Sequence, residues 1–207
     1  QSVLAPKGIL VNLVEFSPLS GGIAACIQAA AAAKPLGMLI AGEPSLPPEA
    51  LPAELPVVLL GSYDRLENCN ICGIHYRDAA EKMVSHLHTM GHRSIWLLQS
   101  SGESPEKAAI TAGYRQAAAA LGLTDRQCRV LEAEDSVVGG YRICREEILT
   151  EKPPQAVFAV SDELAMGVIK AAREENIPLP EGLAVAGFTG SEAAAVITPA
   201  LTTMEHP

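Results

Sequence analysis

The stretch AVFAVSDELAMG, residues 156–167, changes its pattern in the middle, and this change decides the fold class. Its first five residues are apolar without interruption, as in a strand that is buried on both faces. Ser161 and Asp162 follow, and their side-chain oxygens can cap the first turn of a helix. A buried strand that leads directly into a capped helix is the repeating unit of a parallel α/β sheet.

The same alternation extends over the whole chain, which predicts an α/β fold with parallel sheets flanked by helices. We predict strands at 8–14, 37–41, 56–60, 71–74, 94–99, 129–132, 156–160, 183–188 and 202–205. We predict helices at 20–33, 77–90, 105–121, 136–150, 162–175 and 192–196. Ligands of such folds bind beyond the carboxyl ends of the strands, so candidate binding residues should follow the strands.

Composition excludes several classes of protein. The 207 residues are 48% hydrophobic and 19% charged, which excludes a disordered chain. The net charge of −9 argues against binding of this chain to DNA or to an anionic membrane, since such contacts need clustered Lys and Arg. No apolar run approaches the roughly 18 residues of a membrane span. The five cysteines are an odd number at irregular spacing. We therefore expect a cytoplasmic protein with reduced thiols and no membrane partner.

Sequence signatures of catalysis are missing. The chain has no G-x-x-x-x-G-K-[ST] phosphate loop, no G-x-G-x-x-G fingerprint and no G-x-S-x-G elbow. Cys69, Cys72 and His75 have a spacing that could begin a metal site, but a closed zinc site needs a fourth ligand. We interpret the two cysteines as thiols at a junction of loop and strand. We expect no enzyme activity, no cofactor and no metal.

A series of motifs in the second half of the chain is specific in its order and spacing. The motifs are GHRSI (91–95), GYRQA (113–117), AVFAVSDELAMG (156–167), IPLP (177–180), VAGF (185–188) and PALTT (199–203). In this arrangement the chain resembles the effector domain of the LacI (lactose/galactose repressor) family of transcriptional regulators. The resemblance is strong from about residue 56 to the end and weaker over 8–33.

The resemblance implies a two-lobed, type I periplasmic-binding-protein-like fold that closes around a small-molecule effector. The first lobe would contain residues 1–91 plus 204–207, and the second lobe residues 92–203. The family also implies a homodimer and a helix-turn-helix head that binds operator DNA. That head is not present in this chain, so we expect contact with DNA only through a segment before Gln1. An effector switches such a protein only if it binds one lobe arrangement better than the other.

The first lobe departs from the family between Ala33 and Lys34. Family members usually have a further strand and helix at this point, whereas Ala33-Lys34-Pro35 here joins a predicted helix directly to a predicted strand. Either the lobe is naturally trimmed, or residues that belong here are missing from the sequence. We favour the second alternative, because the loss of a strand and its covering helix would expose the core.

The resemblance also marks eight positions that should face the ligand. In sugar-sensing members, charged or amide side chains at four of them bind sugar hydroxyls. Those four positions are occupied here by His75, Ile110, Ser161 and Thr189. The other four positions are Phe16, Ser17, Asp135 and His206. Because the groups suited to sugar hydroxyls are replaced, the effector should not be a simple sugar, or the site is vestigial.

Two other classes of protein share parts of this pattern. A periplasmic solute-binding protein would have the same fold but would act as a monomer, and the missing signal peptide and the motifs at 91–93 and 199–203 favour the regulator. A doubly wound enzyme would need a cofactor fingerprint.

For the regulator we expect helices 162–175 and 191–196 at the dimer interface. Val168→Asp or Ile169→Asp should then give monomers.

Overall fold

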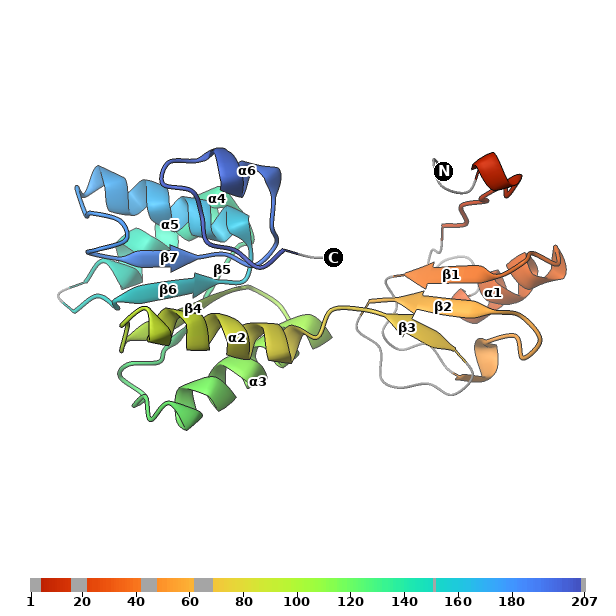
Figure 1. Ribbon diagram of the computed structural model, residues 1–207, viewed down its shortest axis with the longest axis horizontal. Coiled ribbons are helices and arrows are strands. Elements are labelled where there is room, and N and C mark those ends of the chain that lie inside the picture. Colours follow the sequence, from red (N-terminus) through yellow and green to blue (C-terminus); the bar gives the residue numbers. More distant parts are fainter. Residues whose placement is uncertain (1–4, 16–21, 42–47, 62–68, 151, 206–207) are drawn as a thin grey trace. The chain divides into compact units, whose positions relative to one another are not determined.

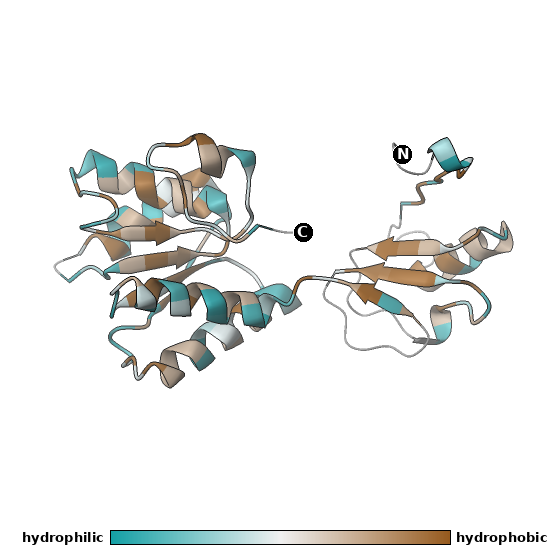
Figure 2. Cartoon of the chain, in the orientation of Figure 1, coloured by the Kyte–Doolittle hydropathy of each residue, from teal (hydrophilic) through white to brown (hydrophobic). Residues whose placement is uncertain are grey.

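The computed structural model describes residues 5–15, 22–41, 48–61, 69–150 and 152–205. The chain divides into two compact units, Gln1–Gly73 (unit 1) and Ile74–Pro207 (unit 2), and each contains its own parallel sheet (Figure 1). Figure 2 shows that the strands of both sheets are mostly apolar. None of the helices in the described part of the chain has the length and apolar character needed to cross a membrane.

Unit 2 is built on a sheet of four parallel strands in the order β5-β4-β6-β7. The strands are β4 (Ile95–Ser100), β5 (Val130–Ala133), β6 (Ala156–Ala159) and β7 (Ala184–Ala186). The helices are α2 (Tyr76–Thr89), α3 (Pro105–Ala120), α4 (Val137–Ile143), α5 (Asp162–Glu174) and α6 (Glu192–Val196). All these strands and helices were predicted, and most of their ends agree to within one or two residues.

Helices cover both faces of this sheet (Figure 1). On one face Phe158 packs in a core cluster with residues of α2 and α3, and on the other Val157 packs with residues of α4 and α5. All four residues of β6 are buried. Burial on both faces is the physical reason for the uninterrupted apolar run in this stretch of sequence.

Helix α2 belongs to unit 2, which differs from the expected lobe boundary at residue 91. Met83, Val84 and Leu87 of α2 lie in the same core cluster as Tyr114 of α3. A Cβ atom on Gly113 would lie 2.2 Å from the carbonyl oxygen of Arg77, so only glycine permits this close packing of the two helices. The two compact units divide between Gly73 and Ile74, and the residues after Thr203 cluster with unit 2, while the lobe boundary implied by the resemblance stays a prediction.

The region predicted as one helix over 136–150 is divided in the structure. Helix α4 ends at Ile143, and a π-helical turn, η4 (Cys144–Ile148), follows it. The strand predicted at 202–205 is also wrong in extent. In the described residues it is reduced to a single parallel bridge between Thr202 and Ala186.

Unit 1 has a smaller sheet of three parallel strands in the order β1-β2-β3. The elements are the 3₁₀ turns η1 (Ala5–Lys7) and η3 (Pro48–Ala50), the helix α1 (Gly22–Ala32), and the strands β1 (Met38–Ala41), β2 (Val57–Leu60) and β3 (Asn70–Cys72). Its core cluster contains five buried residues, namely Ile27, Ile40, Ala50, Val57 and Leu59. Helix α1 covers the sheet face that carries Ile40 and Leu59.

One expectation for unit 1 is wrong, and another stays a prediction. Residues 8–14 form no strand, and Leu10 and Leu13 are 93% and 85% exposed. The chain also turns directly from α1 towards β1, with hydrogen bonds from Ala33 N to Ala30 O and from Lys34 N to Ala31 O. Between α1 and β1 the structure therefore has a short turn at Ala33–Lys34. The expectation that further residues belong at this point stays a prediction.

Candidate functional site

The strands of unit 2 are parallel, so the residues that follow them gather at one edge of the sheet. Asp135 follows β5, Ser161 follows β6 and Thr189 follows β7. We call this region, defined by Asp135, Ser161 and Thr189, the carboxyl edge. The structure therefore brings together three of the eight predicted ligand-binding residues.

Ser161 and Asp135 are directly connected. The Ser161 hydroxyl donates a hydrogen bond to Asp135 Oδ1 at 2.5 Å, and its oxygen accepts one from Leu164 N at 3.2 Å. Of the two possible caps in the sequence, Ser161 thus caps α5, and at the same time it fixes one carboxylate oxygen of Asp135. Ser161 is buried, whereas Asp135 is exposed. The exposed carboxylate can accept hydrogen bonds from hydroxyl or amino groups of a ligand.

Asp162 is the buried support of the loop after β7. Its Oδ1 accepts hydrogen bonds from Phe188 N and from the Thr203 hydroxyl, at 3.1 and 2.6 Å. Its Oδ2 accepts one from Ser191 N at 2.6 Å. The side chain has no exposed surface. We infer that Asp162 positions the carboxyl edge and does not itself contact a ligand.

The pKa of Asp162 reflects this environment. Burial opposes ionisation and would raise the pKa, but the hydrogen bonds from Thr203 and Ser191 outweigh it and lower the pKa below its ordinary value of 3.8. Asp162 is therefore ionised at neutral pH. Gly187 makes the arrangement possible, because a Cβ atom there would lie 2.1 Å from Asp162 Oδ1.

Thr189 is held through the same residue. Its hydroxyl oxygen accepts a hydrogen bond from Asp162 N at 3.2 Å, and its backbone N–H is directed to Asp162 Oδ1 at 3.4 Å. Thr189 is half-buried, so its hydroxyl proton can still be donated to a ligand. Together the carboxyl edge offers one carboxylate acceptor and one hydroxyl donor.

The beginning of α2 lies beside the end of β7. The ring of Tyr76 stacks on Phe188 with a centroid distance of 5.9 Å and an interplanar angle of 28°. Burial, followed by the negative charge of Glu106, raises the pKa of Tyr76, so its phenol stays neutral. His75, the predicted ligand residue, is exposed at the N-cap position of α2 and makes no side-chain capping bond. Tyr76 was not among the predicted ligand residues, although it follows His75 directly, and contact of His75 with a ligand stays a prediction.

Ile110 points into the core. It is 4% exposed and belongs to the cluster between the sheet and the helices α2 and α3. Contact of Ile110 with a ligand stays a prediction. Phe16, Ser17 and His206 lie outside the described residues.

A polar network one helical turn from Ile110 was not predicted. Lys107 Nζ pairs with Glu132 Oε1 at 2.8 Å, and Gln99 Nε2 donates to the same oxygen at 3.2 Å. The Thr111 hydroxyl donates to Gln99 Oε1 at 2.7 Å. The hydrogen bond from Lys107 is the main cause of the lowered pKa of Glu132. The residues Lys107 and Glu132 could have indicated this network, because they are oppositely charged and lie near the start of α3 and the end of β5.

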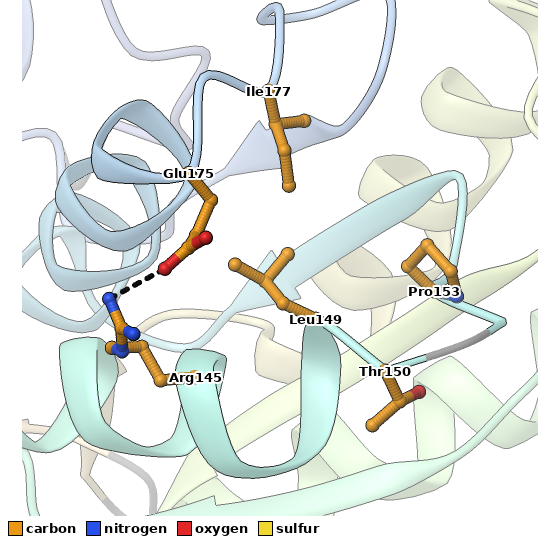
Figure 3. Close-up of a pocket in the computed structure, with 6 residues that line it drawn as sticks. All are labelled: Arg145, Leu149, Thr150, Pro153, Glu175 and Ile177. Carbon is orange, nitrogen blue, oxygen red and sulfur yellow. Dashed lines mark ion pairs between the residues drawn. The ribbon is translucent and has the colours of Figure 1, made fainter.

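A pocket of about 410 Å³ lies elsewhere in unit 2 (Figure 3). It is lined by Arg145, Leu149, Thr150, Pro153, Glu175 and Ile177. Arg145 and Glu175 form an ion pair across it at 2.8 Å. Pro153 precedes β6 and Ile177 precedes β7, so the pocket lies towards the amino ends of these strands. Because ligands of parallel sheets bind at the opposite ends, we assign the candidate site to the carboxyl edge.

The described residues contain no group of three or more His, Cys, Asp or Glu side chains that could hold a metal ion. Cys72 is exposed on β3 and Cys69, just before it, is half-buried. His75 belongs to the other compact unit.

Comparisons with known proteins agree with this architecture. The family described as periplasmic binding protein-like domain matches residues 84–207. Catabolite control protein A of Priestia megaterium is 28% identical over 154 residues, which are 74% of this chain and 46% of that protein. The HTH-type transcriptional repressor CytR of Escherichia coli is 27% identical over 129 residues, which are 62% of this chain and 38% of the repressor. The chain thus spans less than half the length of these relatives.

Solved structures show the same fold. The transcription regulator GntR from Chromobacterium violaceum has a TM-score of 0.77 and 27% identity, and the match covers 98% of this chain and 75% of the regulator. A LacI family regulator from Silicibacter pomeroyi has a TM-score of 0.79 at 21% identity, over 100% of this chain and 78% of that one. The matched family covers more than half of the chain, and these relatives are transcriptional regulators. The chain therefore belongs to the periplasmic binding protein-like domain family, in the form found as the effector domain of LacI-type regulators.

Proposed function

We propose that this chain binds a small-molecule effector and thereby controls DNA binding by a helix-turn-helix head outside it, in a cytoplasmic regulator. The observation that carries the proposal is the carboxyl edge of unit 2. There an exposed carboxylate (Asp135) and a half-exposed hydroxyl (Thr189) are both held in place by hydrogen bonds to the start of α5. Groups that are fixed before a ligand arrives lose little entropy on binding.

The alternative, a periplasmic solute-binding protein, has the same fold but a different set of relatives. The matched relatives, among them catabolite control protein A and the repressor CytR, are regulators, which favours the first reading. None of the matched relatives named here is an enzyme, and we propose that this chain has no catalytic activity.

The effector should not be a simple sugar. Ile110 lies in the core, and the small hydroxyl groups of Ser161 and Thr189 stand where a charged or amide group would bind sugar hydroxyls with two hydrogen bonds. A LacI family regulator from Enterococcus faecium that shares the fold has bound ribose, so ribose is a stringent probe. Calorimetry with ribose, glucose and galactose should detect no binding in the micromolar range. Micromolar binding of any of the three would contradict the proposed ligand class.

The binding role is tested with an edge variant and a matched control. A thermal-shift screen of nucleosides, purine bases and organic acids identifies a stabilising probe, and calorimetry then measures its affinity. Asp135→Ala should weaken that affinity at least tenfold, because it removes the exposed acceptor. Asp125→Ala changes an exposed aspartate between α3 and β5, away from the carboxyl edge, and should leave the affinity unchanged. Equal effects of both variants would contradict the assignment of the site.

We also propose a homodimer with α5 and α6 at its interface, but the test named from the sequence needs correction. Val168 is fully buried and Ile169 is 5% exposed in the core of unit 2, so aspartate at either position would disrupt the fold. Val196, at the end of α6, is 79% exposed. Val196→Asp should therefore shift a dimer to a monomer in analytical ultracentrifugation. A dimer that persists would reject α6 as part of the interface.

A further inference from the structure

The pocket near the amino ends of β6 and β7 is separate from the carboxyl edge, and we call it the amino-end pocket (Figure 3). Its volume of about 410 Å³ lies within the roughly 300–1,000 Å³ of small-molecule sites. Its wall combines the π-helical turn η4 and the residues after it with the end of α5 and the residue before Pro178. π-Helical turns are rare and often occur at functional sites. The pocket therefore has the size and the construction of a further small-molecule site.

One part of the wall is an ion pair between half-exposed groups. Arg145 Nη1 lies 2.8 Å from Glu175 Oε1 and 3.9 Å from Glu174 Oε2. Both contacts use one nitrogen of a guanidinium that carries five N–H donors in total. The side chains of Arg145 and Glu175 are each 45% exposed, and such a pair contributes little to stability. The two groups can therefore separate at low cost and bind a ligand.

Another part of the wall is aliphatic. Leu149 and Ile177 are half-buried, and both pack against the core cluster on the face of the sheet that α4 and α5 cover. This packing holds the two side chains in place, while part of their surface stays open to the pocket. A ligand with a short aliphatic group can cover that surface, and removal of apolar surface from water is favourable.

The charges of the wall select the class of ligand. A simple carboxylate that approached Arg145 would be repelled by Glu174 and Glu175, which already lie beside it. A simple amine that approached Glu175 would be repelled by Arg145. A ligand that carries both groups meets an opposite charge at each end and replaces one ion pair by two. The wall is thus suited to a zwitterion.

The end of α5 favours one orientation of such a ligand. The helix ends at Glu174, and Glu175 is its C-cap residue. The C-terminal end of a helix carries a partial negative charge, which stabilises a nearby positive group. An ammonium group beside Glu175 therefore interacts favourably with both the carboxylate and the helix end. The carboxylate of the ligand is then directed to Arg145.

We propose that the amino-end pocket binds a free α-amino acid with an aliphatic side chain. Its carboxylate pairs with Arg145, its ammonium group pairs with Glu175, and its side chain packs against Leu149 and Ile177. The site lies at the opposite ends of the strands from the carboxyl edge. It is a second site, and it does not depend on the effector role proposed above.

An NMR titration of the isotope-labelled chain with L-leucine tests the location of the site. L-Leucine should bind with a Kd below about 1 mM, and chemical-shift changes should concentrate on the residues that line the amino-end pocket. The absence of a saturable change would overturn the proposal. Changes centred on Asp135, Ser161 and Thr189 would also overturn it, because leucine would then bind at the carboxyl edge.

Two analogues of leucine test the requirement for both charges. Isocaproate lacks the ammonium group and isoamylamine lacks the carboxylate, while the aliphatic chain is retained. Each should bind about tenfold more weakly than L-leucine or worse, because each loses one charge-assisted hydrogen bond and meets a like charge. Binding of either analogue as tightly as L-leucine would overturn the choice of a zwitterion.

Two matched pairs of variants test the assigned charges. Arg145→Gln and Glu175→Gln should each weaken the binding of L-leucine about tenfold. Arg142→Gln and Glu146→Gln remove the same charges at exposed positions that do not line the pocket, and they should leave the affinity unchanged. The amide signals of β4 and β6 report whether each variant retains its fold. Equal affinities in the pocket variants and the controls would overturn the proposal.

Discussion

Strand β6 of unit 2 and the segment 9–14 of unit 1 have similar apolar composition, but only β6 forms a strand in the structure. Both are short apolar runs, and both were predicted as strands from the sequence. All four residues of β6 are buried between β4 and β7 under helices on both faces, whereas residues 10–15 are exposed. The difference shows that an apolar run specifies only the capacity to form a strand. The strand forms only when neighbouring strands pair with it.

The two units differ in the same way as these two segments. Unit 2 has two core clusters, one on each face of its sheet, and unit 1 has a single small cluster. The buried and fixed groups of the candidate site, Ser161 and Asp162, are also in unit 2. The larger apolar core therefore lies in unit 2, and the following substitutions test this comparison.

The largest effect is expected in the core of unit 2. Val168→Asp would place a carboxylate at a fully buried position of α5 and should destabilise unit 2 by about 4–5 kcal/mol or more. Circular dichroism during thermal unfolding measures the loss. Val196→Asp is the matched control on an exposed position and should retain the helical signal. A Val168→Asp protein that is folded and monomeric would instead show that Val168 lies at the dimer interface, as the sequence suggested.

A smaller and local effect is expected in unit 1. Leu59→Ala removes a fully buried side chain of β2 and should cost about 3 kcal/mol. Because the core of unit 1 is a separate cluster, hydrogen exchange should accelerate in β1 and β2 and stay unchanged in β4 and β6. Hydrogen exchange that accelerates equally in both sheets would show that the two units unfold together, which would contradict the comparison.

Asp162→Asn tests the polar support of the carboxyl edge. Loss of hydrogen bonds to a buried charged group should destabilise unit 2 by about 1.5–3 kcal/mol at neutral pH. The folded pKa of Asp162 lies below 3.8, so its contribution is fully present above pH 3.8 and is lost as the pH falls through the lower folded pKa. The difference between wild type and variant should therefore shrink in urea titrations below pH 3.8. A difference that grows with acidity would contradict the lowered pKa.

The smallest effect is expected on the exposed side of unit 1. Leu39→Thr changes a residue of β1 that is 68% exposed and introduces a β-branched side chain, which favours a strand. Its effect on the free energy of unfolding should be below about 0.5 kcal/mol. Urea unfolding provides the measurement. A loss of more than 1 kcal/mol, on the order of a core residue, would show that Leu39 is covered in solution.

Sequence patterns predicted unit 2 well because local and long-range preferences agree there. The helix predicted at 162–175 is α5, and of the two residues expected as possible caps, Ser161 is the one that caps it. The compact units could not be predicted in the same way, because the packing of α2 on α3 depends on contacts such as that of Gly113 with Arg77, which no periodicity reveals. The segment 8–14 was predicted as a strand from its composition. Whether another strand is in place to pair with such a segment cannot be recognised in the sequence pattern.

The candidate site was predicted in part. Asp135, Ser161 and Thr189 were named because the resemblance to the family marks these positions, and each of them follows a predicted strand. Their contact with a ligand stays a prediction. The role of Asp162 as a support for two segments, and the stacking of Tyr76 on Phe188, depend on residues far apart in the sequence. Such contacts can be found only after the sheet order is established.

The most direct test of the binding role is an NMR titration of the isotope-labelled chain with the probe identified by the thermal-shift screen. Chemical-shift changes should concentrate on Asp135, Ser161 and Thr189 and on the first turn of α2. Changes centred on Arg145 and Ile177, which line the pocket at the opposite ends of the strands, would contradict it. A probe that binds without perturbing the carboxyl edge would do the same.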